Sequence, residues 1–455
     1  MLRFVLGRSG YGKTEYLRRH FAELAKNGDD KLLFIVPDQI SFETEEAFLD
    51  LLGPSVSRRI SVLGFSRLCD YVFEATGNRF ATFADEGVRH MIMSLAVEQV
   101  RDGLTVFDKG DSAGTRELLL NAVKEYKKCA IGSAELLDAA EKCGDDTLSA
   151  KLRDTALVYD AYDAIMAQSY MDPLDSLTKV RDLLCDNRLF DGYTVALDAF
   201  YGFTSQEYEV IEQLMMRSKD MFVALTDDGS PGGDSLFLVP RRTRSRLTRM
   251  ARDCGVEVAP LTVLNTPYRF SNEALIALEE NIFRIGKEPF EEATDAVNIY
   301  RASDIYDECD HVARTVRALI EGGCRYRDIV ITTRSAEGYL GVLDTVLDKY
   351  DIPYFMDRPQ NIDAMPLVRL VGAAFDTVNR GFDREDVLTV LKTGLCGYSA
   401  AQIADFENYL FVWDVSGRRF YEPFTASPSG FTDEMTDDDK ASLEGIESLR
   451  EDIIG

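Results

Sequence analysis

The stretch that decides the fold is Gly7-Arg8-Ser9-Gly10-Tyr11-Gly12-Lys13-Thr14. It has the spacing GxxxxGK[ST], in which the glycines let backbone N–H groups converge on phosphate oxygens. Lys13 supplies a point charge, and the hydroxyl of Thr14 can ligate Mg²⁺. An apolar run, Leu2 to Leu6, precedes this stretch, and a segment with helical periodicity follows it. The order of strand, glycine loop and helix predicts a loop that binds nucleotide phosphates.

Four more short apolar segments extend the pattern into an α/β sheet. They are residues 31–36, 59–63, 194–197 and 221–225, each bounded by turn or helix signals. Strands that alternate with helices predict a parallel sheet. Between about residues 84 and 185 the periodicity is helical, which predicts a helical insertion between the third and fourth strands.

A second α/β unit is expected from about residue 296. Its predicted strands are residues 297–300, 328–332 and 353–356, and its predicted helices are residues 304–321 and 339–349. After Met365 the pattern becomes helical again. The last helix carries one apolar face, formed by Leu443, Ile446, Leu449 and Ile453. This helix either packs back locally or belongs to a longer polypeptide, and we expect the longer polypeptide.

Acidic residues dominate the composition. Lys and Arg number 51 against 78 Asp and Glu, a formal net charge of −27. This charge argues against a generally basic nucleic-acid binder and confines any polyanion site to a local patch. The apolar runs are far shorter than the ~20 residues of a membrane span, so we expect a soluble, cytoplasmic protein. The eight cysteines are scattered without a CxxC pair, which predicts reduced thiols rather than a zinc or cluster site.

The end of the fourth predicted strand carries the expected metal ligand. A phosphate-binding loop needs an Asp on a neighbouring strand to hold the Mg²⁺ shell, and usually a Glu beside it to activate water. Asp198 fits the metal position, but the next residue is Ala199. Alanine accepts no proton, so the sequence predicts metal binding without efficient hydrolysis. Later, Arg334 ends a predicted strand, where it either reaches a phosphate or remains a surface cation.

Two features could contact DNA. Six arginines fall close together without a carboxylate among them: Arg241, Arg242, Arg244, Arg246, Arg249 and Arg252. Arginine forks suit phosphate oxygens, so Arg242, Arg246 and Arg249 are candidate DNA contacts. The alternatives are a solvated face or a surface for an acidic partner. Phe65 follows a predicted strand, and it either stacks on a base or belongs to the core.

Several further segments carry a family resemblance. They are IVPDQISFETEEAFL from Ile35, SVLGFSRL from Ser61, ALDAFYGFTSQEYEVIEQL from Ala196, YRDIVITTRSAEGYLGVLDTVLDKYDIPYFMD from Tyr326, VLTVLKTGL from Val387 and ENYLFVWDVSGRRFYEPF from Glu407. In order and spacing these blocks, with the phosphate loop, resemble the B subunit of AddAB-type (RexAB-type) ATP-dependent helicase/deoxyribonucleases across essentially the whole chain.

The resemblance implies a superfamily 1 helicase-like P-loop core in residues 1–83 and 186–290, with a helical insertion in residues 84–185. A second core begins in residues 291–365, and a mostly helical insertion follows in residues 366–455. Within this framework, residues 7–14 are the expected phosphate contacts. Thr14 and Asp198 are the expected Mg²⁺ ligands, and Arg334 is the relic of an arginine that contacts the γ-phosphate.

The resemblance also implies a function. The chain is expected to bind ATP and Mg²⁺ as a degenerate motor and to contact single-stranded DNA while scanning for a recombination hotspot. It would act at double-strand DNA ends in a bacterial heterodimer with an AddA-type helicase/nuclease subunit. The nuclease and the iron–sulfur cluster of the family belong to a C-terminal part outside these residues.

Two other functions are compatible with a phosphate loop. An active ATP-driven DNA translocase is disfavoured by Ala199 and by the absence of a glutamine soon after Asp227-Asp228-Gly229, where a helicase would sense the γ-phosphate. A P-loop small-molecule kinase is disfavoured by the length of the chain and by the second α/β unit.

Overall fold

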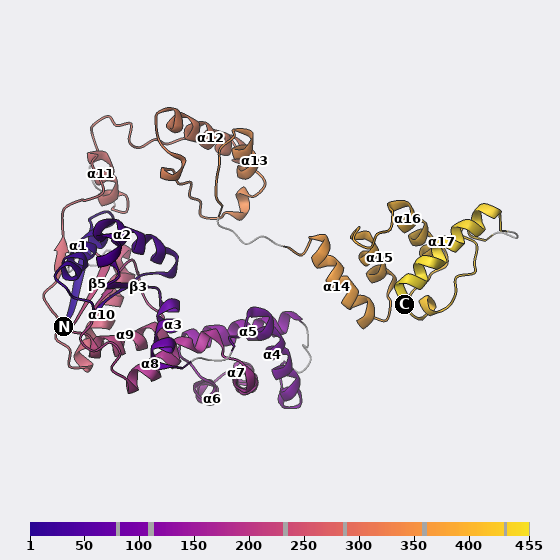
Figure 1. The fold of residues 1–455 in the computed structure, drawn as a ribbon, viewed down its shortest axis with the longest axis horizontal. Coiled ribbons are helices and arrows are strands. Elements are labelled where there is room, and N and C mark those ends of the chain that lie inside the picture. Colours follow the sequence, from indigo (N-terminus) through magenta and orange to yellow (C-terminus); the bar gives the residue numbers. More distant parts are fainter. Residues whose placement is uncertain are drawn as a thin grey trace. The chain divides into compact units, whose positions relative to one another are not determined.

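The computed structural model describes residues 1–78, 82–107, 113–230, 235–284, 289–356, 362–431 and 435–454. The chain divides into two units, Met1–Ile299 and Tyr300–Gly455 (Figure 1). None of the described helices is both long and apolar enough to cross a bilayer.

The first unit is built on a six-stranded parallel sheet with the strand order β3-β2-β4-β5-β1-β6. The strands are β1 Leu2–Gly7, β2 Leu32–Ile35, β3 Ile60–Leu63, β4 Thr194–Leu197, β5 Asp220–Thr226 and β6 Thr262–Leu264. β1 pairs with β5 from Leu2 to Gly7 and with β6 over its last three residues. The predicted parallel α/β sheet is confirmed by its first five strands. The sixth escapes sequence reasoning because three half-buried residues at a sheet edge carry too little periodicity.

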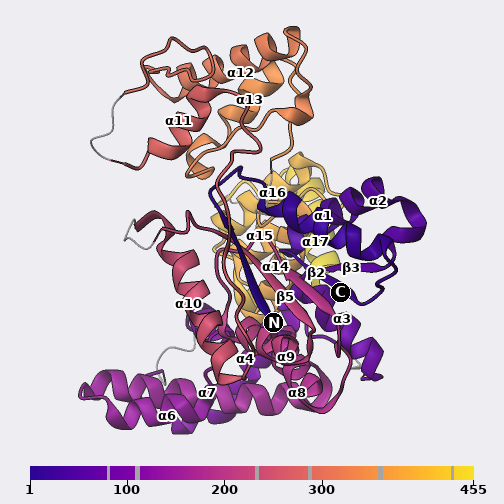
Figure 2. The same cartoon turned by 90° about the vertical axis from the view of Figure 1, so that its left-hand side faces the viewer.

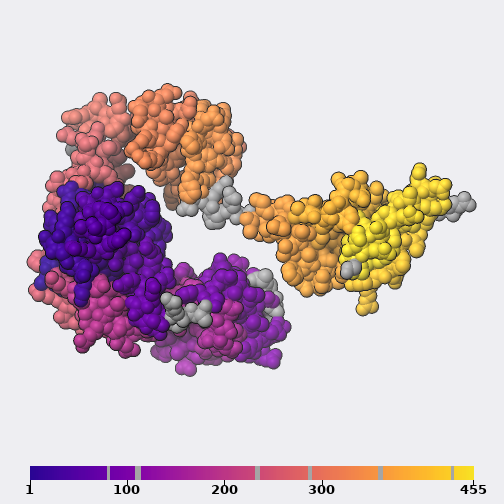
Figure 3. Space-filling model, viewed as in Figure 1, coloured from indigo at the N-terminus to yellow at the C-terminus, as the bar shows by residue number. Residues whose placement is uncertain are grey.

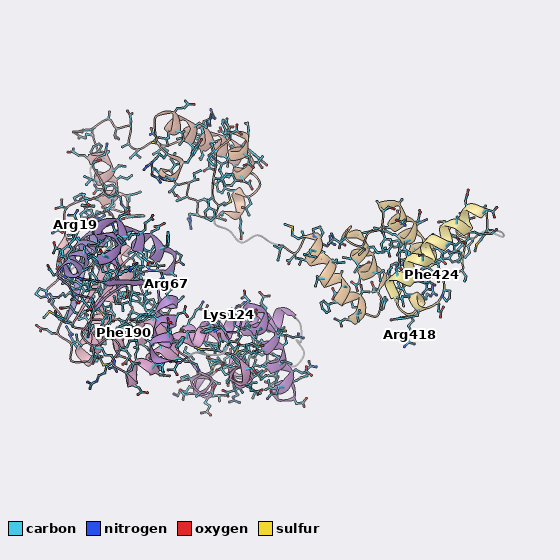
Figure 4. The ribbon with its side chains drawn as sticks, viewed as in Figure 1. Arg19, Arg67, Lys124, Phe190, Arg418 and Phe424 are labelled. Carbon is cyan, nitrogen blue, oxygen red and sulfur yellow. The ribbon has the colours of Figure 1, made fainter. Side chains whose placement is uncertain are left out.

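Helices cover both faces of this sheet (Figure 2). On one face lie α1 (Lys13–Lys26) and α2 (Ser41–Ser57), whose apolar residues share a core with alternate strand residues. The opposite face is covered by α3 (Phe65–Thr76), α8 (Ser176–Asp186), α9 (Ser205–Arg217) and α10 (Leu238–Asp253). Phe190, labelled in Figure 4, is fully buried in this second core. Burial on both faces explains why the strands read as continuous apolar runs.

A helical region separates β3 from β4 in the sequence, as predicted. Its helices are α4 (Glu86–Val100), α5 (Ala113–Lys128), α6 (Ser133–Lys142) and α7 (Asp146–Ser169). They enclose an apolar core of their own, which includes Met93, Val123 and Tyr162. In Figure 3 the purple residues of this region lie beside the indigo residues of the N-terminal part of the first unit.

A buried ion cluster joins this helical region to the chain that leads back to the sheet. Lys127 on α5 is 3% exposed. Its Nζ atom lies 2.8 Å from a carboxylate oxygen of Asp163, 3.2 Å from Asp172 and 2.7 Å from Asp175. Tyr162 donates a hydrogen bond of 3.0 Å to Asp172. Because Asp175 directly precedes α8, the cluster ties α5 and α7 to a helix of the sheet core.

The second unit begins with α12 (Ile305–Glu321) and α13 (Leu343–Lys349), which pack on each other where helices were predicted. The strands predicted at residues 297–300, 328–332 and 353–356 are wrong for this structure: the described residues there belong to no strand. Val330 is 80% exposed and Phe355 is 90% exposed. An extended segment becomes a strand only when a neighbouring strand pairs with its backbone, and no described segment of this unit does so.

The rest of the second unit is helical, as expected. It contains α14 (Pro366–Asn379), α15 (Arg384–Lys392), α16 (Ala400–Val412) and α17 (Asp437–Ile454). α15–α17 surround a core that includes Phe406 and Phe424, the latter labelled in Figure 4. α17 buries Ile446 and Leu449 in this core, so its apolar face does pack back locally.

Candidate nucleotide-binding site

The predicted phosphate loop connects β1 to α1 at the carboxyl edge of the sheet. Gly12 caps α1 with a φ of 82°, and Gly10 has a φ of 79°, a region that glycine enters without steric cost. A Cβ atom on Gly10 would lie 2.7 Å from the ring of Phe270. The loop therefore requires glycine here both for its backbone and for space, and it leaves the N–H groups at the start of α1 available to an anion.

A cavity of about 440 Å³ opens at this loop. Its lining residues come from the loop and α1, from the ends of β4 and β5, and from the segment after β6: Ser9, Gly10, Gly12, Lys13, Thr14, Glu15, Arg18, Asp198, Ala199, Phe200, Tyr201, Ala224, Thr226, Tyr268 and Arg269. The carboxyl ends of parallel strands are where open α/β sheets bind ligands. The cavity therefore joins the phosphate loop to the predicted metal residue.

Three cationic side chains line this cavity, and one of them, Arg18, is paired with Glu15. Lys13 donates hydrogen bonds of 2.8 and 2.9 Å to the carbonyl oxygens of Gly7 and Arg8. Burial lowers the pKa of Lys13, Asp198 opposes that shift, and Arg269 adds to it through its own positive charge. No carboxylate in the described ranges forms an ion pair with Arg269. Lys13 and Arg269 thus place two positive charges where the phosphates of a nucleotide would lie.

Asp198 has the environment of a metal ligand. Its side chain is buried, with 2% of the residue exposed, and its Oδ2 atom has no hydrogen-bond partner. Burial raises the pKa of Asp198, while hydrogen bonds from the Thr14 side chain and the Ala199 N–H oppose that rise. A buried carboxylate oxygen without a partner, next to a hydroxyl, fits Mg²⁺, which prefers oxygen ligands and takes the rest from phosphates and water. The described ranges contain no group of three or more His, Cys, Asp or Glu placed to hold a metal, so this fit depends on Thr14 and Asp198.

Ala199 lines the cavity at the position where a catalytic glutamate was expected. Its φ is 64°, a left-handed conformation that costs a non-glycine residue roughly 1–2 kcal/mol. Apart from Asp198, the one lining carboxylate is Glu15. Arg19 lies 2.6 Å and Arg18 3.4 Å from the oxygens of Glu15. Apart from the predicted metal ligand Asp198, the lining therefore offers no carboxylate without an ion-pair partner.

Two side chains of the predicted loop turn away from the cavity. Arg8 and Tyr11 do not line it. Instead both contact α11 (Glu273–Asn281), through Glu279 and Glu280 respectively. The prediction that all of residues 7–14 contact phosphate is therefore corrected for these two side chains, because their polar atoms are already engaged.

The acidic pair after β5 holds α10 in place. Asp227 lies 3.1 Å from Arg241 and 2.9 Å from Arg244, and Asp228 lies 2.9 Å from Arg241. Asp227 is 1% exposed and does not line the cavity. The acidic pair therefore forms an ion network with α10, and two of the six arginines are structural.

The three arginines predicted to contact DNA remain on the surface. Arg242, Arg246 and Arg249 are exposed on α10, and the guanidinium of Arg246 lies 3.8 Å from the ring centroid of Tyr208. At helical spacing they form one stripe along α10, on the order of 10 Å long. We call these three residues the arginine stripe.

The other two predicted contacts lie elsewhere. Phe65 is 6% exposed, and its ring packs against Phe200 and Phe203 at centroid distances of 5.7 and 6.3 Å. Base stacking needs an exposed ring face, so Phe65 belongs to the core and its assignment as a stacking residue is wrong for this structure. Arg334 lies exposed in a bend of the second unit, where its contact with a phosphate stays a prediction.

Sequence reasoning missed Tyr268 and Arg269. The N–H groups of both residues donate to the carbonyl oxygen of Gly10, at 2.9 and 2.8 Å. Tyr268 also lines a second hollow of about 740 Å³ along the exposed face of α1, next to the first cavity. The guanidinium of Arg19, labelled in Figure 4, lies 5.9 Å from the Tyr268 ring centroid. The sequence signal for these residues was Pro267-Tyr268-Arg269 after a short apolar segment. It indicates a position at the site only if that segment is recognised as the strand β6.

The chain is similar to proteins of one family over most of its length. The family model described as ADDB, N-terminal, matches residues 4–279, more than half of the chain. The B subunit of the ATP-dependent helicase/deoxyribonuclease of Clostridium tetani is 28% identical over 435 residues, which cover 92% of this chain and 38% of that relative. The protein of the same name from Caldanaerobacter subterraneus is 29% identical over 465 residues, 99% of this chain and 40% of the relative.

These relatives are longer than the sequence described. The chain spans about two fifths of their length. The matched residues 4–279 include the phosphate loop, Asp198, the arginine stripe and α11 as far as Glu279. On the extent of that match, the chain belongs to the ADDB N-terminal family.

Proposed function

We propose that this chain is the ATP-binding, helicase-like N-terminal part of the B subunit of an ATP-dependent helicase/deoxyribonuclease. The observation that carries the proposal is the convergence, in one cavity, of the phosphate loop, Lys13, Thr14 and the partnerless Oδ2 atom of Asp198. In this proposal the backbone of the loop and Lys13 hold the phosphates, and Thr14 and Asp198 hold Mg²⁺. The metal supplies charge neutralisation on the phosphates when it is bound.

Adenine recognition falls to the segment after β6. The second hollow adjoins the phosphate cavity and shares Gly12, Glu15 and Tyr268 with it. Tyr268 is 60% exposed, so its ring has a free face on which a base can stack. Arg269 is then available to the outer phosphates, and Arg334 is a further candidate from the second unit.

The wider role follows from the names of the relatives. As a B subunit, the protein would process double-strand DNA breaks for recombinational repair with a helicase/nuclease partner of the A type, in the bacterial cytoplasm. This part would contact single-stranded DNA and scan for a hotspot sequence. The arginine stripe is our candidate DNA contact, and residues 291–365 are our candidate for the first part of a second helicase core. The nuclease and its iron–sulfur cluster would belong to the remaining length of the relatives.

Lys13→Ala is the direct test of nucleotide binding. We expect MgATP affinity, measured by calorimetric titration, to fall about 10- to 100-fold, because one charge-assisted hydrogen bond to phosphate contributes about 1.5–3 kcal/mol. Lys26→Ala is the matched control, since Lys26 lies exposed on the same helix. Equal affinity of wild type and Lys13→Ala would contradict the proposed phosphate site.

Ala199→Glu tests why hydrolysis should be slow. We expect ATP turnover to rise severalfold, with the ~10² of a well-placed general base as the upper bound. Ala199→Gln has the same size but cannot act as a base, so its turnover should stay at the wild-type level. Equal turnover of the two variants would mean that features other than the missing carboxylate limit hydrolysis.

A further inference from the structure

The phosphate loop is attached to α11 by a buried arginine. Arg8 is 7% exposed. Its Nε atom donates to the carboxylate of Glu279 at 2.9 Å, and its Nη2 atom donates to the Glu279 carbonyl oxygen at 2.8 Å. The guanidinium also lies 5.3 Å from the ring centroid of Phe237. An arginine with two hydrogen bonds to one residue and an aromatic ring beside it has little freedom to turn toward the cavity.

Tyr11, three residues after Arg8, makes a second contact between the loop and α11. It is 6% exposed, and its hydroxyl donates to the carboxylate of Glu280 at 2.9 Å. Burial, together with the hydrogen bond to Glu280, raises the pKa of Tyr11 to about 12. Arg8 and Tyr11 flank Ser9 and Gly10, which line the phosphate cavity. The part of the loop that faces the ligand therefore lies between two residues, each of which is hydrogen-bonded to α11.

We propose that Glu279 and Glu280 are positioning residues that set the shape of the phosphate loop and thereby the affinity for nucleotide. Neither residue lines the cavity, so each acts through Arg8 or Tyr11. The inference rests on the proposed function, because it concerns the same nucleotide site. It adds that the Arg8 side chain serves the loop and not the ligand, and that Tyr11, which also lines the second hollow, holds the loop through Glu280.

The physical reason is preorganisation. Phosphate binding depends on several backbone N–H groups that point at the same oxygens, so a small shift of the loop weakens many hydrogen bonds together. Glycines at positions 10 and 12 allow the loop backbone several conformations. Contacts with residues outside the loop must therefore select one of them. The hydrogen bonds to Gly10 from Tyr268 and Arg269 restrain one side. The two glutamates restrain the other.

The double variant Glu279→Gln/Glu280→Gln tests this role. Glutamine keeps the size of each side chain but removes the charge that fixes Arg8. We expect MgATP affinity, measured by calorimetric titration, to fall about tenfold, as for other supporting partners of a binding site. Without nucleotide, the amides of residues 9–14 should exchange with deuterium faster than in wild type. The matched control is Glu273→Gln, an exposed residue in the first turn of the same helix.

Two further measurements separate the possible outcomes. The charge swap Arg8→Glu/Glu279→Arg should bind MgATP more tightly than the double variant Glu279→Gln/Glu280→Gln. General damage to α11 would not allow this recovery. Unchanged affinity and unchanged loop exchange in the double variant would overturn the inference, and so would tighter binding caused by a released Arg8. If wild type itself fails to bind MgATP, the proposed function is wrong, whereas the exchange measurement still decides whether α11 holds the loop.

Discussion

Reversing the arginine stripe with Arg242→Glu, Arg246→Glu and Arg249→Glu is expected to weaken single-stranded DNA binding several hundredfold at about 50 mM salt. Each phosphate contact on a single strand contributes roughly 0.7 to the slope of log affinity against log salt. Three lost contacts should therefore flatten the slope by about 2. Over the roughly 1.3 decades between 50 mM and 1 M salt, that difference amounts to several hundredfold.

The stripe has the dimensions for such contacts. Arg242 and Arg249 lie on the order of 10 Å apart along α10, a length over which an extended single strand presents more than one phosphate. Arg241 and Arg244 are held by Asp227 and Asp228, which fixes the helix that presents the stripe. In a chain with a net charge of −27, such an exposed group of arginines is where a polyanion can approach.

The control variants separate the position of the arginine stripe from a change in net charge and from a loss of folding. Reversal of Lys151, Arg153 and Arg188, which are exposed elsewhere in the first unit, changes the net charge equally and should leave the slope almost unchanged. Arg242→Glu/Arg249→Glu keeps Arg246 over Tyr208 and should give about two thirds of the effect. A wild-type slope in the triple variant would show that the stripe serves an acidic protein surface or solvent instead.

The sequence predicted the first sheet well because its signals are local. Five strands, the phosphate loop and Asp198 each follow from an apolar run beside a turn or a glycine motif. What the sequence does not carry is the direction of a side chain. Arg8 and Arg242 are both arginines in informative segments, but Arg8 is buried against Glu279 and Arg242 is exposed.

Long-range partners account for the remaining errors. From its place after a predicted strand, Phe65 was a candidate loop residue. In the structure, Phe200 and Phe203, which follow β4 in the sequence, pack against its ring. Tyr268 and Arg269 reach the site only because β6 pairs with β1, far away in sequence. Residues 328–332 read as a strand, but a strand also needs a neighbour, and periodicity does not report whether one is present.

Lys127→Met is expected to destabilise the chain by about 3–5 kcal/mol, the usual cost when a buried ion cluster loses one partner. Asp163, Asp172 and Asp175 would then share a buried site without a positive charge. Chemical denaturation followed by circular dichroism measures the loss. Lys128→Met is the matched control, because its ion pair with Glu125 is exposed and surface pairs contribute at most about 1 kcal/mol.

The pH dependence of the Lys127 variant identifies the cause of its instability. Burial already raises the pKa of Asp163 and of Asp175, and Lys127 opposes that rise. Without the lysine the folded-state pKa values move further above those of the unfolded chain. The folded variant then takes up protons before the unfolded chain does, so its deficit relative to wild type should shrink as the pH falls toward the ordinary range of aspartate. A deficit that stays constant from neutral to acidic pH would mean that lost packing of the lysine stem, and not unpaired carboxylate charge, destabilises the junction between the helical region and α8.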